Sequence, residues 1–116
     1  MEDHQTQHTC KVFVAHCMDF RFQKSVMELL ARLGLNYGDF DRLTVAGGAG
    51  NFNALEDHIH LSKKLHTPSS AILLVHEDCG AGAKKEDLHH AKRIVFPHIE
   101  KVLCFYLRLN GEVEEV

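Results

Sequence analysis

Short apolar runs of β-forming residues alternate along this chain with stretches of helical periodicity, and this alternation limits the possible fold more than any other feature. The run at 71–75, Ala-Ile-Leu-Leu-Val, is continuously apolar, as expected for a strand at the centre of a sheet covered by helices on both faces. Two further β-rich runs stand at 11–15 and 42–46. Helical stripes occupy 23–33, about 53–65, and 84–95. Strands that alternate with helices predict a mainly parallel sheet with right-handed crossovers.

Turn residues set the expected limits of these elements. Asn53 and Glu56 stand at capping-box spacing, and the helix that they begin must end before Pro68. A β-rich run over 102–109 is followed by Asn110-Gly111, the dipeptide typical of a tight hairpin. We therefore predict an α/β fold, with a mainly parallel central sheet of about four strands flanked by helices and a C-terminal antiparallel hairpin strand.

The overall composition favours one domain and argues against several partners. A chain of 116 residues fits one core, so 1–116 is expected to be a single domain. The net charge of −3 arises from interspersed charges without a basic stripe, which argues against nucleic acid as a partner. The polar segment 1–5 does not resemble a secretion signal, and no apolar run reaches the roughly 18 residues that span a membrane. We expect a cytoplasmic protein with no membrane partner, whose four cysteines are reduced.

Three potential metal ligands follow the predicted strands. Cys17 comes after the first strand, and His76 and Cys79 come after the third. Carboxyl ends of parallel strands share one edge of a sheet, where ligands gather. Zinc favours thiolate and imidazole ligands in tetrahedral array, so these three side chains predict a Zn²⁺ site.

Asp19 and Arg21 stand two and four residues beyond Cys17. Asp19 would either be the fourth zinc ligand or stand beside a bound water, and a bidentate pair with Arg21 would favour the second arrangement. Each short motif taken alone is also compatible with an ordinary turn and a surface ion pair. Their conjunction at adjacent strand ends favours the metal site.

Several other residues can be given either a functional interpretation or a simpler structural one. The turn 48–50 resembles part of a dinucleotide fingerprint, but position 53 is Asn, so close backbone packing is the better interpretation. Alternation along a strand turns His16 away from Cys17, which predicts a packing role. Cys10 and Cys104 are expected to be small core or strand residues. Most of the other histidines are expected to be solvated, because two lie near the amino terminus and five fall on predicted helices. These are His4 and His8, and His58, His60, His66, His89 and His90.

The metal motifs resemble those of the β-class carbonic anhydrases. Cys17-Met-Asp-Phe-Arg21 matches the family's Cys-x-Asp-x-Arg motif, and 76–80, His-Glu-Asp-Cys-Gly, matches its His-x-x-Cys-Gly motif. The segment 47–51, Gly-Gly-Ala-Gly-Asn, is similar to the family's Arg-Asn-Ala-Gly-Asn turn, with Gly47 and Gly48 in place of arginine and asparagine. Val75 stands where the family usually has glycine, and the chain is much shorter than typical members.

The resemblance implies a zinc enzyme that is a homodimer or a higher homo-oligomer. Cys17, His76 and Cys79 would bind Zn²⁺, and Asp19 with Arg21 would form the catalytic dyad. Metal-bound hydroxide would then hydrate carbon dioxide reversibly to bicarbonate. The alternatives are a carbonyl sulfide or carbon disulfide hydrolase using the same site, a non-catalytic zinc protein, and a redox dithiol formed by Cys17 and Cys79.

Overall fold

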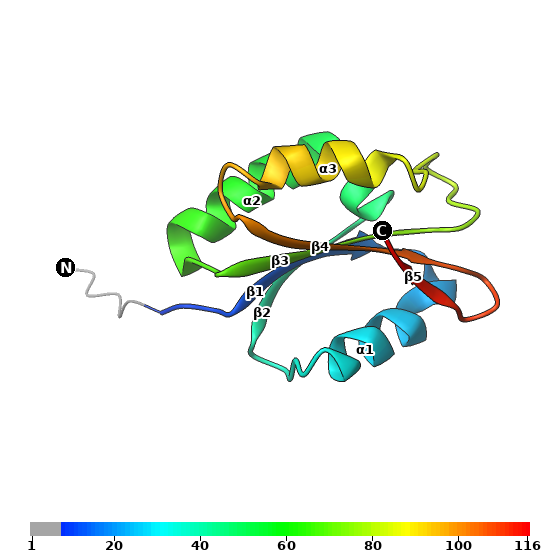
Figure 1. The fold of residues 1–116 in the computed structure, drawn as a ribbon, viewed down its shortest axis with the longest axis horizontal. Coiled ribbons are helices and arrows are strands. Elements are labelled where there is room, and N and C mark those ends of the chain that lie inside the picture. The colour runs from blue at the N-terminus through cyan, green and yellow to red at the C-terminus, as the bar shows by residue number, and fades with distance from the viewer. Residues whose placement is uncertain (1–7) are drawn as a thin grey trace, which may run out of the picture.

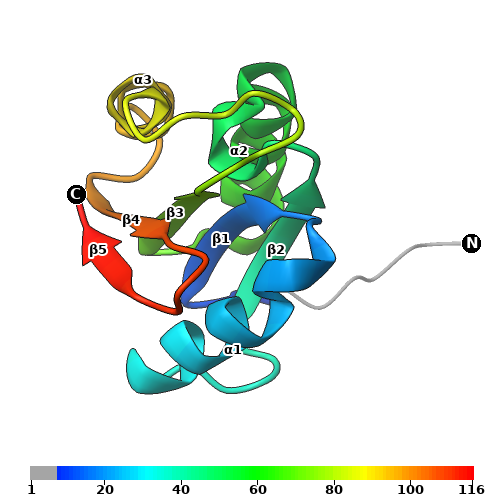
Figure 2. The ribbon, with the colours of Figure 1, turned by 90° about the vertical axis from the view of Figure 1, so that its right-hand side faces the viewer.

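Five strands form one sheet in this computed structural model, which describes residues 8–116; the polar segment 1–5 lies outside the described residues. The strands are β1 (Val12–Cys17), β2 (Phe40–Val45), β3 (Ser70–His76), β4 (Lys101–Leu107) and β5 (Val113–Glu115). Their order across the sheet is β2-β1-β3-β4-β5 (Figure 2). β1 to β4 run parallel, and β5 pairs antiparallel with β4. The predicted α/β fold with a closing antiparallel strand is confirmed, and β3 lies at the centre as predicted.

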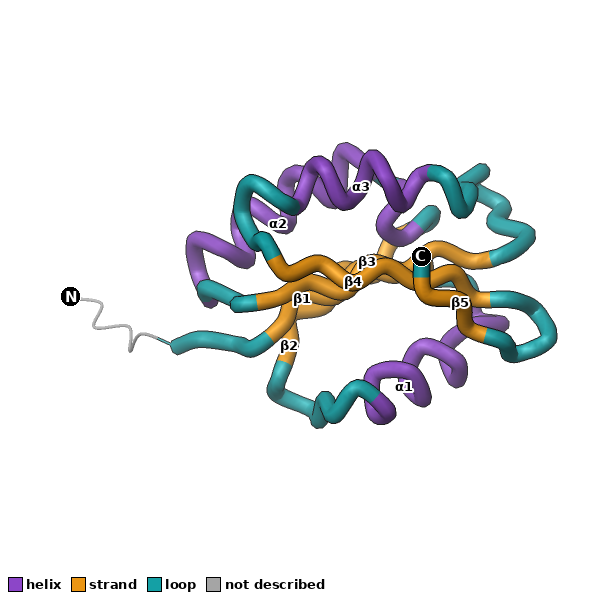
Figure 3. The backbone as a smooth tube through the Cα atoms, viewed as in Figure 1, coloured by secondary structure: helices purple, strands orange, loops and turns teal. Residues whose placement is uncertain are grey.

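Helices cover both faces of the sheet. Helix α1 (Gln23–Arg32) lies below the sheet in Figure 1, and α2 (Phe52–His66) and α3 (Asp87–Val95) lie above it (Figures 1 and 3). In the sheet, β2 and β3 are the two neighbours of β1. The connection from β1 to β2 therefore runs in one direction across the sheet, and the connection from β2 to β3 runs in the opposite direction. Right-handed crossovers that leave in opposite directions place their helices on opposite faces. The chain therefore diverges at the carboxyl ends of β1 and β3, which lie at the right in Figure 1.

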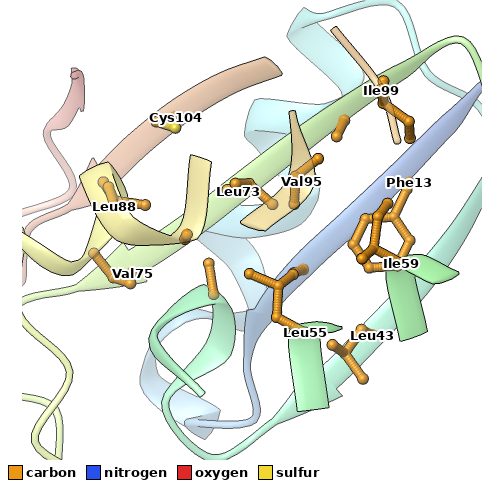
Figure 4. Close-up of a cluster of buried hydrophobic side chains, with 14 residues drawn as sticks. Phe13, Leu43, Leu55, Ile59, Leu73, Val75, Leu88, Val95, Ile99 and Cys104 are labelled. Carbon is orange, nitrogen blue, oxygen red and sulfur yellow. The ribbon is translucent and has the colours of Figure 1, made fainter. Parts of the chain in front are cut away.

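The core has one apolar layer on each face of the sheet. Phe13 and Leu73 pack with Leu55 and Ile59 of α2 in the layer that Figure 4 shows. The alternate β1 residues, such as Val14, face α1 in the other layer. Successive side chains of a strand point to opposite faces, so a strand covered on both faces needs apolar residues throughout. This explains the apolar runs 12–15 in β1 and 71–75 in β3.

Most element boundaries differ from the sequence predictions by one or two residues, and three differences concern helix starts and the hairpin. Helix α2 begins after Asn51, whose side chain accepts a hydrogen bond from the Ala54 amide at 3.3 Å, so the predicted capping box of Asn53 and Glu56 is wrong. Helix α3 begins at Asp87 rather than at residue 84. The hairpin connection is 108–112 rather than a two-residue turn. The Gly111 amide donates to the Arg108 carbonyl at 3.0 Å, and Gly111 has φ +92°, which glycine adopts without strain.

Candidate metal centre

The carboxyl ends of β1 and β3 hold the three predicted metal ligands. Cys17 is the last residue of β1 and His76 is the last residue of β3, which is its neighbour in the sheet. Cys79 follows in the loop after β3. One donor atom from each of the three residues lies within 4.8 Å of the other two. The fold thus brings together side chains that are as far apart in the sequence as Cys17 and Cys79.

His76 presents an unpaired nitrogen to this cluster. Its Nδ1 lies 2.8 Å from the backbone carbonyl of Glu77, which can only accept a hydrogen bond, so Nδ1 carries the proton. In the neutral imidazole Nε2 is then the acceptor. Within residues 8–116, this Nε2 is the buried side-chain nitrogen or oxygen that has no hydrogen-bond partner. The side chain is only 3% exposed and its ring stacks on Phe22 at 4.1 Å between centroids. Buried polar atoms are rarely left unsatisfied, and a bound cation would satisfy this one.

The turn after β2 packs tightly against Cys17. The Gly47 amide lies 3.4 Å from the Cys17 sulfur and donates toward it. Gly48 has φ +56°, and a Cβ added there would lie 2.6 Å from the Cys17 amide nitrogen and 2.8 Å from the Leu74 carbonyl oxygen. No side chain fits in that space. The close approach supports the packing interpretation of the turn, and it also accounts for one of the glycines that depart from the family pattern.

Asp19 and Arg21 form a bidentate ion pair at the rim of the cluster. Arg21 Nη2 donates to Asp19 Oδ2 at 2.7 Å, Nε lies 3.1 Å from Oδ1, and the Arg21 amide donates to Oδ1 at 2.9 Å. Hydrogen bonds from the Arg21 side chain, and then from its amide, lower the pKa of Asp19 to about 2. Asp19 Oδ2 also lies 3.8 Å from Nε2 of His76. The carboxylate is held by Arg21 while one of its oxygens remains close to the ligand cluster.

Asp78 is a member of the site that the sequence analysis missed. Arg21 Nη1 donates to Asp78 Oδ2 at 3.1 Å, and Nη2 donates to the Asp78 backbone carbonyl at 3.0 Å. Asp78 has φ +59°, a left-handed conformation that aspartate tolerates better than most residues. Its position between His76 and Cys79 is the only signal in the sequence. Asp78 therefore holds the guanidinium through Nη1 and Nη2, whereas Asp19 holds it through Nε and Nη2.

A shallow groove of about 620 Å³ opens beside the cluster. Asp19, Arg21 and Asp78 supply its polar groups, and its apolar lining includes Met18 and Phe20. Phe20 is 84% exposed and Met18 is 62% exposed. The groove therefore places apolar side chains beside the polar groups of Asp19 and Arg21 and beside Cys17, which also lines it.

The remaining candidates fall into three groups. His16 is buried, with Nδ1 3.0 Å from the Cys17 carbonyl and Nε2 3.3 Å from the Thr44 hydroxyl, and burial lowers its pKa, in agreement with a packing role. Cys104 lies in the core as predicted. The prediction for Cys10 is wrong, because Cys10 is only half-buried and precedes β1. His66 is an exception among the mostly solvated histidines, since it pairs with Asp41 at 2.7 Å. No cysteine in the described residues forms a disulfide.

Comparisons with solved structures identify the fold. The chain superposes on a carbonic anhydrase of Streptococcus mutans with a TM-score of 0.64 and 20% identity, covering 100% of this chain and 87% of that one. A tetrameric β-carbonic anhydrase of Sordaria macrospora gives 0.56 and 13%, covering 94% and 81%. The apo form of a carbon disulfide hydrolase gives 0.57 and 14%, covering 92% and 78%. No protein-family model and no curated protein sequence matches the chain.

These similarities establish that the chain has the β-carbonic anhydrase fold. The fold is shared by enzymes with different named substrates, so it does not by itself decide the reaction. The alignments cover most of each of these structures, at 87%, 81% and 78% of their chains.

Proposed function

We propose that this chain is a zinc-dependent carbonic anhydrase-type lyase that hydrates carbon dioxide reversibly to bicarbonate. In this proposal Cys17, His76 and Cys79 are the zinc ligands, Asp19 and Arg21 are the catalytic dyad, and residues 1–116 form one zinc-binding domain. The observation that carries the proposal is the unpaired, buried Nε2 of His76 within 4.8 Å of two thiols.

The residues present fit a zinc ion. One imidazole and two thiols match the ligand preference of zinc, and two thiolates would neutralise its double charge in this partly buried site. The proton on His76 Nδ1 is held by the Glu77 carbonyl, which leaves Nε2 available and fixes the ring orientation. Zinc, when bound, would lower the pKa of a coordinated water to about 7 and so supply a nucleophile at neutral pH.

Asp19 would act as the hydrogen-bond acceptor that orients this nucleophile. An aspartate with a pKa of about 2 is fully ionised at neutral pH, so it can accept but not donate. Arg21 prevents Asp19 from rotating freely because it holds both carboxylate oxygens, and Asp78 in turn holds Arg21. The apolar groove wall that includes Met18 and Phe20 would admit a small, uncharged, linear substrate.

The test is stopped-flow carbon dioxide hydration at neutral and alkaline pH, with zinc content measured on the same preparation. We expect activity in the wild type and its loss in Cys79→Ser, together with the loss of one zinc equivalent. Cys104→Ser is the matched control, because Cys104 is a buried cysteine outside the cluster and its variant should keep both activity and zinc. A wild type that binds zinc at the cluster but hydrates no carbon dioxide at either pH would refute the enzyme assignment.

Carbon disulfide or carbonyl sulfide hydrolysis is the second candidate function. The shared fold with a carbon disulfide hydrolase favours it, and the same residues would act on another linear substrate. Release of hydrogen sulfide from either substrate, without carbon dioxide hydration, would select this candidate. A non-catalytic zinc site would show neither activity, and removal of the metal would then chiefly lower the thermal stability.

We also propose that the protein is cytoplasmic and forms a homodimer or a higher homo-oligomer. The exposed Met18 and Phe20 side chains at the groove rim support association, and the Sordaria macrospora enzyme of the same fold is tetrameric. Reduced cysteines suit the cytoplasm. No helix in residues 8–116 has both the length and the apolar character that crossing a membrane requires. Sedimentation equilibrium would test the oligomer, and a monomer at micromolar concentration would contradict it.

A further inference from the structure

A second cluster of potential metal ligands lies at the opposite end of the sheet. Cys10 lies two residues before the start of β1, Asp41 lies in β2, and His66 is the last residue of α2. One donor atom from each lies within 4.8 Å of the other two. The β1 strand separates this cluster from Cys17, so the two clusters are roughly 20 Å apart at about 3.3 Å per strand residue.

Hydrogen bonds hold the three segments of this cluster in place. His66 Nδ1 lies 2.9 Å and 2.7 Å from the two Asp41 carboxylate oxygens, and the Ser62 hydroxyl donates to Asp41 Oδ2 at 2.6 Å. The Cys10 amide donates to the His66 carbonyl at 3.0 Å, which fixes the backbone of the amino-terminal segment against the end of α2. These contacts bring the ligand atoms together before any cation binds, and a cation would take the place of the hydrogen bond between His66 and Asp41.

The donor set also points to a particular kind of cation. Thiolate, imidazole and carboxylate together are the borderline-soft set that zinc accepts, whereas magnesium and calcium prefer oxygen donors alone. The His8 ring lies 4.9 Å from the His66 ring between centroids and brings another imidazole to this end of the sheet. A cavity of about 260 Å³, lined in part by Asp41 and His66, leaves room for a further ligand such as water.

We propose that Cys10, Asp41 and His66 bind a second zinc ion, which ties the amino-terminal segment to β2 and α2. The simpler explanation is a plain ion pair between Asp41 and His66, supported by Ser62. In that explanation the Cys10 sulfur donates to the Val12 carbonyl at 3.6 Å and needs no metal, so the case for a cation rests on the three donor atoms that lie within 4.8 Å of one another. The two explanations differ in one measurable respect, because an ion pair needs no metal.

The experiment counts zinc in four proteins after loading and removal of excess metal: the wild type, Cys79→Ser, Cys10→Ser and the double variant. If both sites exist, the expected numbers of zinc ions per chain are about two, one, one and none. If only the central site exists, they are one, none, one and none. If only the second site exists, they are one, one, none and none. Failure of this inference is thus distinguishable from failure of the proposed function.

A second readout does not depend on stoichiometry. Zinc bound at this cluster should slow alkylation of Cys10 in the Cys79→Ser protein, measured by mass spectrometry of the peptide that contains Cys10. His66→Gln in the same background should abolish that protection while leaving Cys10 in place. Carbon dioxide hydration by the Cys10→Ser protein should match that of the wild type.

Two results would overturn the inference. One is an equal zinc content in the wild type and Cys10→Ser, and the other is alkylation of Cys10 at the same rate with and without zinc. Circular dichroism melting of each variant excludes unfolding as the cause of a lost zinc ion. If Cys10→Ser does not fold, Asp41→Asn replaces it in the same four-protein comparison.

Discussion

Replacing Gly48 with alanine tests how closely the turn after β2 packs against the candidate metal centre. A Cβ at this position would lie 2.6 Å from the Cys17 amide nitrogen and 2.8 Å from the Leu74 carbonyl oxygen. Both neighbours are backbone atoms of central strands, so neither can move without disturbing the sheet. Gly48 also has φ +56°, where an alanine is strained independently of the available space.

The size of the effect can be worked out from a matched glycine. Gly34 has φ +83° and nothing within 4 Å of an added Cβ, so Gly34→Ala should cost only the left-handed strain of about 1–2 kcal/mol. Gly48→Ala adds overpacking of about 1–3 kcal/mol, for a total of about 2–5 kcal/mol. At roughly 4 °C per kcal/mol for a domain of this size, the melting temperature should fall by about 4–8 °C for Gly34→Ala and by about 8–20 °C for Gly48→Ala.

Circular dichroism melting of the two variants and the wild type measures the difference directly. We also expect Gly48→Ala to bind zinc less tightly, because relief of the clash must displace the Cys17 backbone. Equal melting temperatures for the two variants, with unchanged zinc content, would refute the close-packing argument. A larger loss in Gly48→Ala than in Gly34→Ala would support it.

The other predictions concern the acidic side of the site and its metal. Asp19→Asn should lower carbon dioxide hydration by about 10²–10⁴-fold while retaining zinc; loss of zinc as well would identify Asp19 as a ligand. Arg21→Gln should raise the pKa of Asp19 from about 2 toward 3.8, as followed by carboxyl NMR titration, and an unchanged pKa would contradict the assigned cause. Because the pKa of Asp19 is lower in the folded protein, its ionised carboxylate stabilises the fold above the unfolded-state pKa of about 3.9. This stabilisation is lost as the pH falls toward about 2. The difference in melting temperature between the wild type and Arg21→Gln should therefore shrink between pH 4 and pH 2, and a constant difference would argue against this linkage. Removal of zinc with a chelator should lower the melting temperature of the wild type more than that of Cys79→Ser, whereas equal shifts would count against a central zinc ion.

The regular elements could be predicted closely because their signals are local. A β-rich run identified β1 and a continuous apolar run identified β3, and the helical stripe that begins at Gln23 predicted α1 to within one residue of its end. The start of α2 was misplaced because Asn51 and Asn53 are both good capping residues, and the tight glycine turn decides which of them stands at the helix end. Local sequence offers both choices, and packing selects one.

The sequence by itself determined the order of strands and helices along the chain and the three residues at the candidate metal centre. It could do so because periodicity reveals buried faces, and because parallel strands bring their carboxyl ends to one edge. Only the tertiary structure decided that Asp78 holds Arg21, across 57 residues, and that Asp41 meets His66, across 25. Those contacts depend on where a loop or a helix end lies relative to the sheet, and no repeating pattern in the chain encodes that position.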